Sequence, residues 1–121
     1  MILWISGNSK AGKTTLANQL KGERTIVLDG DRMRATISRN AGFSKKDRWE
    51  HNLRTARLAK ELEGQGFRVI VSLICPYRDL RKKVRDITNC KFLYLAGGKK
   101  HKDFPYEDPI GINRWTIYKE P

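Results

Sequence analysis

Residues 5–20 have the sequence ISGNSKAGKTTLANQL, and this stretch decides the fold. It contains the pattern G-x-x-x-x-G-K-[ST], which is completed by Gly7, Gly12, Lys13 and Thr14. The apolar run at residues 2–6 predicts a buried strand before the motif, and residues 13–21 predict a helix after it. A glycine-rich loop between a strand and a helix is the setting in which this motif cradles nucleotide phosphates.

This loop, the P-loop, predicts the binding of a nucleoside triphosphate. Its glycines let the backbone amides and the N-terminus of the following helix point at the phosphates. Lys13 would bring a positive charge to the β and γ phosphates, and the hydroxyl of Thr14 would ligate Mg²⁺. The candidate nucleotide-binding residues are Gly7, Asn8, Ser9, Lys10, Ala11, Gly12, Lys13, Thr14 and Thr15.

Strands and helices are expected to alternate along the rest of the chain. The predicted strands are residues 25–29, 67–74, 91–96 and 114–118, and the predicted helices are residues 30–40, 44–62 and 78–87. The β-branched run 67–74 is the best candidate for a central strand, and Ser44 with Asp47 resembles a capping box. Residues 1–121 are therefore expected to form one α/β domain, a three-layer P-loop NTPase fold whose mostly parallel sheet of about four to five strands is flanked by helices.

The chain is strongly basic, with 25 Lys and Arg against 13 Asp and Glu and a net charge of +12. The excess is concentrated in residues 32–60 and 78–102, where it would attract nucleic acid or small charged nucleotides, or simply form a solvated surface. No apolar run approaches the ~20 residues that cross a bilayer, and the opening MILWIS lacks the positive flank of a signal peptide. No membrane partner is therefore expected. Cys75 and Cys90 have no metal or redox spacing, so a cytoplasmic protein with reduced thiols is expected.

Two carboxylates follow the predicted strand 25–29, in the stretch VLDGDRMR. Many P-loop proteins place an Mg²⁺-directing Asp at the end of a central strand, where this chain has Ser72. An acid pair after the second strand suits a kinase, with Asp31 accepting the proton of the acceptor hydroxyl and Asp29 orienting water on the metal. Helix N-capping is the alternative role for either acid. Lys13, Asp29 and Asp31 are therefore the candidate catalytic residues.

These motifs occur in an order that resembles the adenylylsulfate kinases, which use ATP to phosphorylate the 3′-hydroxyl of adenosine 5′-phosphosulfate. The matching stretches are SGNSKAGKTTLA, LDGDRMR, GFSKKDRWEHNLR, AKELEGQGFRVIVSLICPYR and PYEDP, over residues 3–80 and near residue 105. The resemblance implies ATP and Mg²⁺ as cofactors and a small nucleotide as the acceptor. It also allows a homodimer, because members of the family are often dimeric.

The resemblance further implies an acceptor site. Asp31 and Arg34 would contact the acceptor nucleotide, Phe43 would stack on its adenine, and Arg48 would bind its phosphosulfate. A core position for Phe43 and a solvated helix face for Arg48 remain the alternatives. The implied acceptor residues are Asp31, Arg34, Phe43, Arg48, His51, Ile74, Cys75, Pro76 and Phe104.

The chain departs from the family pattern in three places. His51 and Leu53 stand where the family usually has Asn and Arg, and Cys75 stands where it usually has Ser. Members also carry a helix and a basic lid before PYE, whereas LYLAGGKKHKDFPYE bridges that gap here. A lid excludes water and supplies cations to the transferred phosphoryl group. The residues of this shorter stretch that could replace the cations of the lid are Lys99, Lys100 and Lys102.

The sequence leaves three functions open. The first is a minimal adenylylsulfate kinase, which the resemblance favours. The second is a kinase that acts on a hydroxyl of nucleic acid, such as a hydroxymethylated base or a 5′ end, because basic patches and an open cleft suit a polymer. The third is a nucleotide-binding module without turnover.

Overall fold

A five-stranded sheet forms the centre of the computed structural model, which describes residues 1–99, 102 and 105–121. The strands are β1 (Ile2–Gly7), β2 (Thr25–Asp29), β3 (Arg68–Ser72), β4 (Lys91–Leu95) and β5 (Thr116–Tyr118). Their order in the sheet is β2-β3-β1-β4-β5, with β5 antiparallel to β4 and every other neighbouring pair parallel. The expected α/β fold with a mostly parallel sheet is confirmed, and β3 is an interior strand as predicted.

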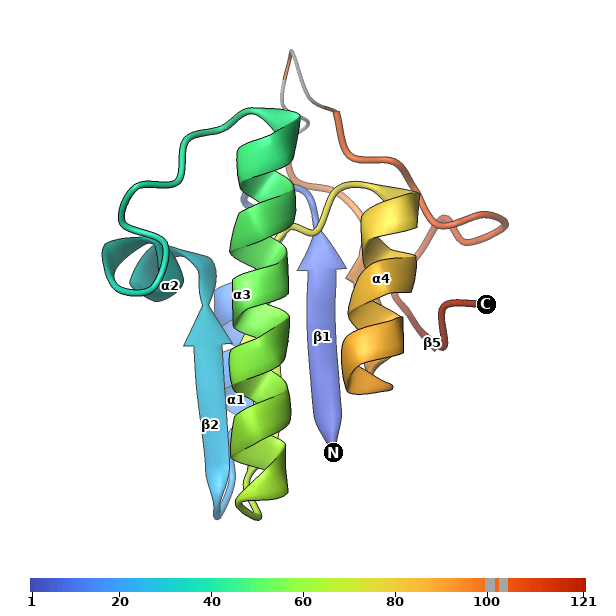
Figure 1. Cartoon of the computed structure of the whole chain (residues 1–121). Coiled ribbons are helices and arrows are strands. Elements are labelled where there is room, and N and C mark those ends of the chain that lie inside the picture. The colour runs from blue at the N-terminus through green and yellow to red at the C-terminus, as the bar shows by residue number, and fades with distance from the viewer. Residues whose placement is uncertain (100–101, 103–104) are drawn as a thin grey trace.

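Helices cover both faces of this sheet (Figure 1). The helices are α1 (Lys13–Leu20), α2 (Gly30–Ala35), α3 (Lys45–Gly64) and α4 (Arg78–Thr88). Trp4 and Val71 pack on one face in the core that includes residues of α3 and α4, whereas Ile5 and Ile70 pack on the other face with Ala17 of α1. Because alternate side chains of a strand point to opposite faces, burial of both faces explains the continuous apolar runs of β1 and β3.

Several predicted elements are shorter in the structure; the last strand, predicted over 114–118, spans only Thr116–Tyr118, and the two differences nearest the carboxyl edge of the sheet are in α2 and β3. The helix predicted to reach residue 40 ends at Ala35, because the backbone turns at Thr36 and the amide of Ser38 donates to the carbonyl of Met33 at 2.9 Å. The strand predicted over 67–74 ends at Ser72, the last residue of β3 that pairs with β1 and β2. The polar capping predicted for α3 is present, since the Ser44 hydroxyl accepts from the Asp47 amide at 3.1 Å.

The carboxyl ends of the four parallel strands meet at one edge of the sheet. Gly7 ends β1, Asp29 ends β2, Ser72 ends β3 and Leu95 ends β4. β1 lies between β3 and β4, so the connections after β1 and after β4 leave the sheet side by side at this edge. Ligands of open parallel sheets bind at this edge. Within the described part of the chain, no helix has the length and apolar character needed to span a membrane.

Candidate active site

The P-loop wraps around the side chain of its own lysine. Gly12, the N-cap of α1, has φ +96, a left-handed conformation that favours glycine. The Nζ of Lys13 donates to the carbonyl of Asn8 at 2.8 Å across the loop. Burial lowers the pKa of Lys13 to about 8, because the charged ammonium is partly removed from water. A phosphate placed in the loop would favour the charged form again.

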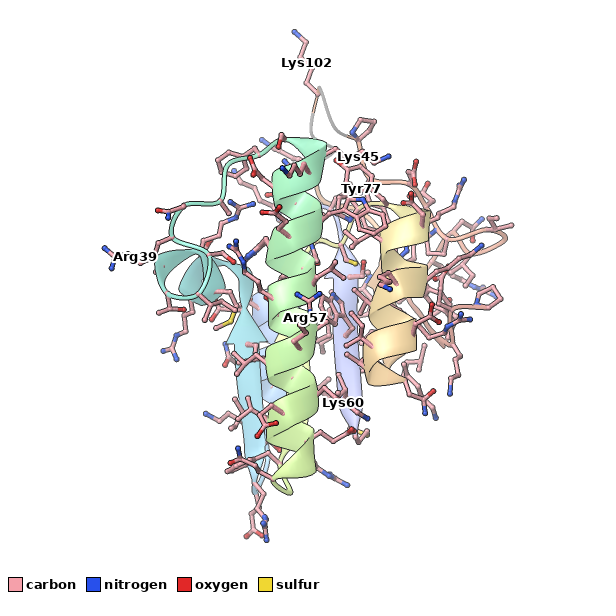
Figure 2. The ribbon with its side chains drawn as sticks, viewed as in Figure 1. Arg39, Lys45, Arg57, Lys60, Tyr77 and Lys102 are labelled. Atoms are coloured by element: carbon pink, nitrogen blue, oxygen red, sulfur yellow. The ribbon has the colours of Figure 1, made fainter. Side chains whose placement is uncertain are left out.

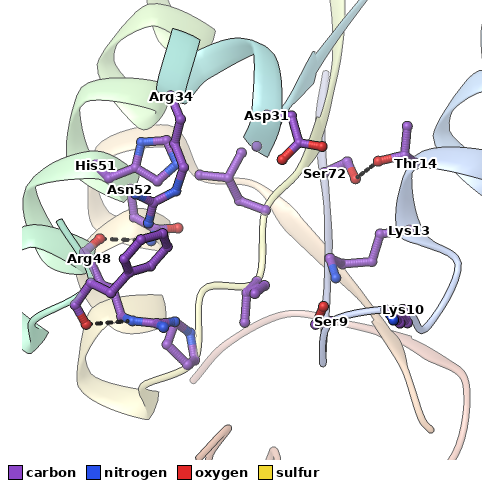
Figure 3. A pocket seen from close by; sticks show the side chains of 15 residues that line it. Ser9, Lys10, Lys13, Thr14, Asp31, Arg34, Arg48, His51, Asn52 and Ser72 are labelled. Carbon is purple, nitrogen blue, oxygen red and sulfur yellow. Dashed lines mark hydrogen bonds between the residues drawn. The ribbon is translucent and has the colours of Figure 1, made fainter. Parts of the chain in front are cut away.

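A cavity of about 330 Å³ lies between the P-loop and the helices α2 and α3. Its P-loop side is lined by Ser9, Lys10, Lys13 and Thr14. The wall formed by α2, α3 and the residues between them contributes Gly30, Asp31, Arg34, Phe43, Arg48, His51 and Asn52, and the chain at the end of β3 contributes Ser72, Leu73, Ile74 and Pro76. Figure 3 shows Lys13 and Ser9 on one side of this cavity, across from Arg34, His51 and Arg48. Donor and acceptor residues predicted from the sequence therefore meet in one space.

The two acids of the DGD stretch have different positions. Asp29 caps α2, because its Oδ1 accepts from the Arg32 amide at 3.0 Å, and it does not line the cavity. Asp31, two residues later in the first turn of α2, is exposed and lines the cavity. The structure therefore favours capping over a metal-directing role for Asp29, and it leaves Asp31 as the carboxylate that can reach a ligand there.

Phe43 presents an exposed ring that is held by two guanidinium groups. The Cζ of Arg34 lies 4.3 Å from the ring centre, and that of Arg48 lies 5.8 Å from it. Arg48 also donates from Nε to the carbonyl of Phe43 at 3.0 Å. Phe43 is 60% exposed and so is not a core residue, whereas Arg48 is buried and does not form a solvated helix face. An exposed aromatic ring beside two cations suits a nucleotide with an anionic tail.

His51 and Asn52 bring unsatisfied polar atoms to the wall of the cavity. Both side chains are buried, and within the described residues the Nδ1 of His51 and the Oδ1 of Asn52 have no hydrogen-bond partner. Burial, and then the charges of Arg34 and Arg54, lowers the pKa of His51 to about 4, so its ring is neutral at pH 7. A buried polar atom without a partner is costly unless a ligand or water satisfies it. Sequence reasoning missed Asn52, although its spacing of four residues from Arg48 places it on the same face of α3.

The oxygen atoms near the P-loop fit Mg²⁺. The hydroxyls of Thr14 and Ser72 are hydrogen-bonded at 3.2 Å, and Asp31 lines the same cavity. Mg²⁺ prefers oxygen ligands and is usually held by few protein groups together with substrate phosphates and water. Within residues 1–99, 102 and 105–121, no three His, Cys, Asp or Glu side chains form a metal-binding group, so the protein alone would supply only part of the coordination.

Comparison with known proteins agrees with this geometry. The family model described as Adenylylsulphate kinase matches residues 1–110. The chain belongs to the adenylylsulphate kinase family. An adenylyl-sulfate kinase of Burkholderia ambifaria is 46% identical over an alignment of 90 positions, which covers 69% of this chain and 50% of the relative. A probable adenylyl-sulfate kinase of Aeropyrum pernix is 40% identical over an alignment that covers 99% of this chain and 70% of the relative.

Solved structures of adenylylsulphate kinases share the fold. A structure of the Mycobacterium tuberculosis APS kinase superposes with a TM-score of 0.72 at 30% identity, covering 91% of this chain and 80% of that one. The same kinase in complex with AMPPNP and APS has a TM-score of 0.65 at 33% identity, covering 77% of this chain and 59% of that one. This family member spans about half the length of the first curated relatives it matches, 50% of one and 58% of another.

Cys75 does not line the cavity of this family member, which corrects the expectation from the resemblance. Its side chain is fully buried in the core that includes residues of α3 and α4, while its neighbours Ile74 and Pro76 line the cavity. The backbone of Cys75 has φ +47, and its carbonyl accepts from Nη1 of the buried Arg81 at 2.8 Å. Because this left-handed turn directs the thiol inward, burial raises the pKa of Cys75 well above its usual range.

The PYEDP stretch supports this wall from outside. Arg81 also donates to the carbonyl of Glu107, and the amide of Glu107 donates to the carbonyl of Pro76 at 2.7 Å. The hydroxyls of Tyr106 and Ser6 are hydrogen-bonded at 2.6 Å, which joins the same stretch to the end of β1. This stretch therefore holds residues 74–76 beside the P-loop.

The remaining predicted site residues lie outside the lining of the cavity or outside the described part of the chain. Gly7, Asn8, Ala11, Gly12 and Thr15 belong to the P-loop or the start of α1 but do not line the cavity. Figure 2 shows Lys102 extending away from the body of the protein. Phe104 and Lys100 lie outside the described residues.

Proposed function

We propose that this adenylylsulphate kinase family member transfers the γ-phosphate of ATP to the 3′-hydroxyl of adenosine 5′-phosphosulfate. The observation that carries the proposal is the single cavity that joins the P-loop to Asp31 and to the Phe43 ring with its two arginines. A phosphoryl transfer needs both substrates held in line in one site, and this cavity has the P-loop on one side and the exposed Phe43 ring with Arg34 and Arg48 on the other. The M. tuberculosis relative in complex with AMPPNP and APS supports the same pair of substrates.

The donor side would bind the triphosphate of ATP. Amides at the start of α1 would point at the phosphates, and Lys13 would leave the Asn8 carbonyl to bind the β and γ phosphate oxygens. Thr14, whose hydroxyl is hydrogen-bonded to Ser72, would be the protein ligand of Mg²⁺. When bound, Mg²⁺ would neutralise charge that develops on the phosphates.

The acceptor side would bind the second nucleotide. Its adenine would stack on the exposed Phe43 ring, and Arg48 would bind the phosphosulfate. Arg34 is already oriented, because its Nη1 donates to the carbonyls of Ala41 and Gly42. Its charge beside the cavity would strengthen the binding of an anionic acceptor.

Asp31 would act as the base in the transfer. The 3′-oxygen of the acceptor forms a bond to the γ-phosphorus, and the bond from that phosphorus to the bridging β–γ oxygen breaks. The proton of the 3′-hydroxyl passes to the carboxylate of Asp31, and ADP leaves with the electron pair of the broken bond. Lys13 stabilises the charge on the transferred group.

One labelling experiment tests the proposal against both alternatives. γ-labelled ATP is offered in parallel to adenosine 5′-phosphosulfate, plain DNA and DNA that contains hydroxymethyluracil. We expect label on adenosine 5′-phosphosulfate alone, strongly reduced by Lys13→Ala and by Asp31→Asn. Lys91→Ala is the matched control, since Lys91 is exposed and pairs with Leu3 at the opposite end of the sheet. Label on either DNA would establish the polymer kinase instead, and ATP binding without any labelled product would establish the module without turnover.

A further inference from the structure

The segment that follows β4 lies against the backbone of the P-loop. The carbonyl of Gly97 accepts from the Nδ2 of Asn8 at 3.0 Å, and the amide of Lys99 donates to the carbonyl of Ser9 at 2.7 Å. Ser9 and Lys99 thereby form an isolated antiparallel bridge. Residues 97–99 therefore hold residues 8 and 9 of the P-loop through contacts that no part of the motif itself supplies.

Gly98 allows this close approach. It has φ +71, and a Cβ at this position would collide with the Ser9 carbonyl oxygen and lie 2.9 Å from the Ala11 amide nitrogen. Gly97 beside it has φ +96 but open space around its Cβ position. Both glycines have a backbone conformation that disfavours other residues, but only at Gly98 would an added Cβ meet the P-loop. The two positions therefore separate backbone strain from a steric collision with the loop.

The bridge also determines the side on which Lys99 lies. Directly opposed residues of an antiparallel pair place their side chains on the same face. Ser9 lines the cavity, and the bridge directs the side chain of Lys99 to the same side, although Lys99 is not itself one of the residues that line the cavity. Lys99 is exposed, and its four-carbon stem can move the ammonium toward an anion.

We propose that residues 97–99 form part of the ATP site: their backbone keeps the P-loop in shape, and the ammonium of Lys99 binds the outer phosphate of ATP. A cation at the outer phosphate would stabilise the charge of the transferred group, as Lys13 does from within the loop. This inference rests only on the ATP-binding half of the proposed function.

A pair of lysine variants tests the role of the charge. Lys99→Ala and Lys91→Ala each remove one exposed positive charge, the first beside the P-loop and the second at the other end of β4. Their dissociation constants for ATP and for ADP are measured by calorimetry with Mg²⁺ and without an acceptor. We expect Lys99→Ala to weaken ATP binding about fivefold, as an exposed ion pair does, and ADP binding less. Lys91→Ala should leave both constants unchanged, and equal effects of the two variants on ATP would overturn the charge role.

A pair of glycine variants tests the role of the backbone. Gly97→Ala should lower the melting temperature through strain at positive φ, and Gly98→Ala should lower it further because its Cβ also collides with the Ser9 carbonyl. Only Gly98→Ala should lose ATP binding, by tenfold or more relative to Gly97→Ala, because only its Cβ displaces the P-loop. Equal ATP affinity of the two variants would refute the backbone role, and if Gly98→Ala does not fold the lysine pair decides.

The outcome for the acceptor is read separately. The binding constants are measured without an acceptor. An absence of phosphate transfer to adenosine 5′-phosphosulfate would therefore refute the proposed function and leave this inference intact. Conversely, normal transfer with unchanged ATP constants in Lys99→Ala and Gly98→Ala would refute this inference alone.

Discussion

Replacing each acid of the DGD stretch by its amide separates a structural carboxylate from a catalytic one. Asp29 accepts the Arg32 amide at the start of α2 and does not line the cavity, whereas Asp31 does line it. Asn caps a helix as well as Asp does, so Asp29→Asn keeps the hydrogen bond to Arg32. The amide of Asp31→Asn cannot accept a proton from the acceptor hydroxyl. We therefore expect Asp29→Asn to keep phosphate transfer and Asp31→Asn to lose it.

The structure sets the size of each effect. Asp29→Ala removes the cap and should lower the free energy of unfolding by about 1 kcal/mol, or roughly 4 °C in melting temperature for a domain of this size. The ion pair between Asp29 and Arg32 adds little, because its atoms are 3.7 Å apart and Arg32 is 80% exposed. Loss of a general base should slow transfer by about 10²–10⁴-fold in Asp31→Asn. Its effect on stability should stay below about 1 kcal/mol, which is the value of a charge at a helix N-terminus.

Two measurements on the same preparations check this reasoning. Thermal unfolding followed by circular dichroism gives the stability order, and ADP release at saturating ATP and adenosine 5′-phosphosulfate gives the rates. The expected pattern is that Asp29→Ala is destabilised while Asp29→Asn resembles the parent in both assays, and that Asp31→Asn is stable but slow. A rate for Asp29→Asn as low as that for Asp31→Asn would refute the division of roles. So would a full rate in Asp31→Asn.

Three further predictions follow from buried titratable groups. The affinity for ATP should fall as pH rises above about 8, because Lys13 then loses its proton. Calorimetry at pH values on both sides of 8 measures this fall. An unchanged affinity would contradict the placement of Lys13 in the P-loop. His51 should show no NMR titration until pH approaches about 4, and because unfolding restores its pKa of 6.5, stability should fall as pH falls between these values. Burial raises the pKa of Cys75, and that of Cys90 to about 11, so both thiols should resist iodoacetamide at pH 8 until denaturant is added; rapid alkylation of the folded protein would refute their burial.

Much of the fold could be predicted from local patterns. The strand over residues 25–29 and the helix that begins at Lys13 lie where periodicity and the motif placed them. The early end of α2 at Ala35 was not predicted, because it depends on contacts outside the helix. The Arg34 guanidinium donates hydrogen bonds to the carbonyls of Ala41 and Gly42, and these bonds hold the chain after α2 close to the helix.

The acceptor wall was harder to predict than the P-loop. Asn52 had no motif to mark it, and its role appears only because α3 turns that face toward the cavity. Cys75 was placed in the pocket through its neighbours in sequence, but a left-handed backbone at this residue sends its thiol into the core. Arg81 holds that turn from six residues away, a contact that spacing alone does not reveal.

The amino-acid order alone determined the phosphate-binding loop, because the amides, the lysine and the hydroxyl that bind phosphate are neighbours along 5–20 and need only one strand and one helix. It also determined the alternation of strands and helices, since apolar periodicity is a local property. Only the tertiary structure decided which side of the cavity each carboxylate, arginine and thiol reaches. Those directions depend on how α2, α3 and the segment after β4 pack at the sheet edge, and packing joins residues such as Ser9 and Lys99 that are far apart in the chain.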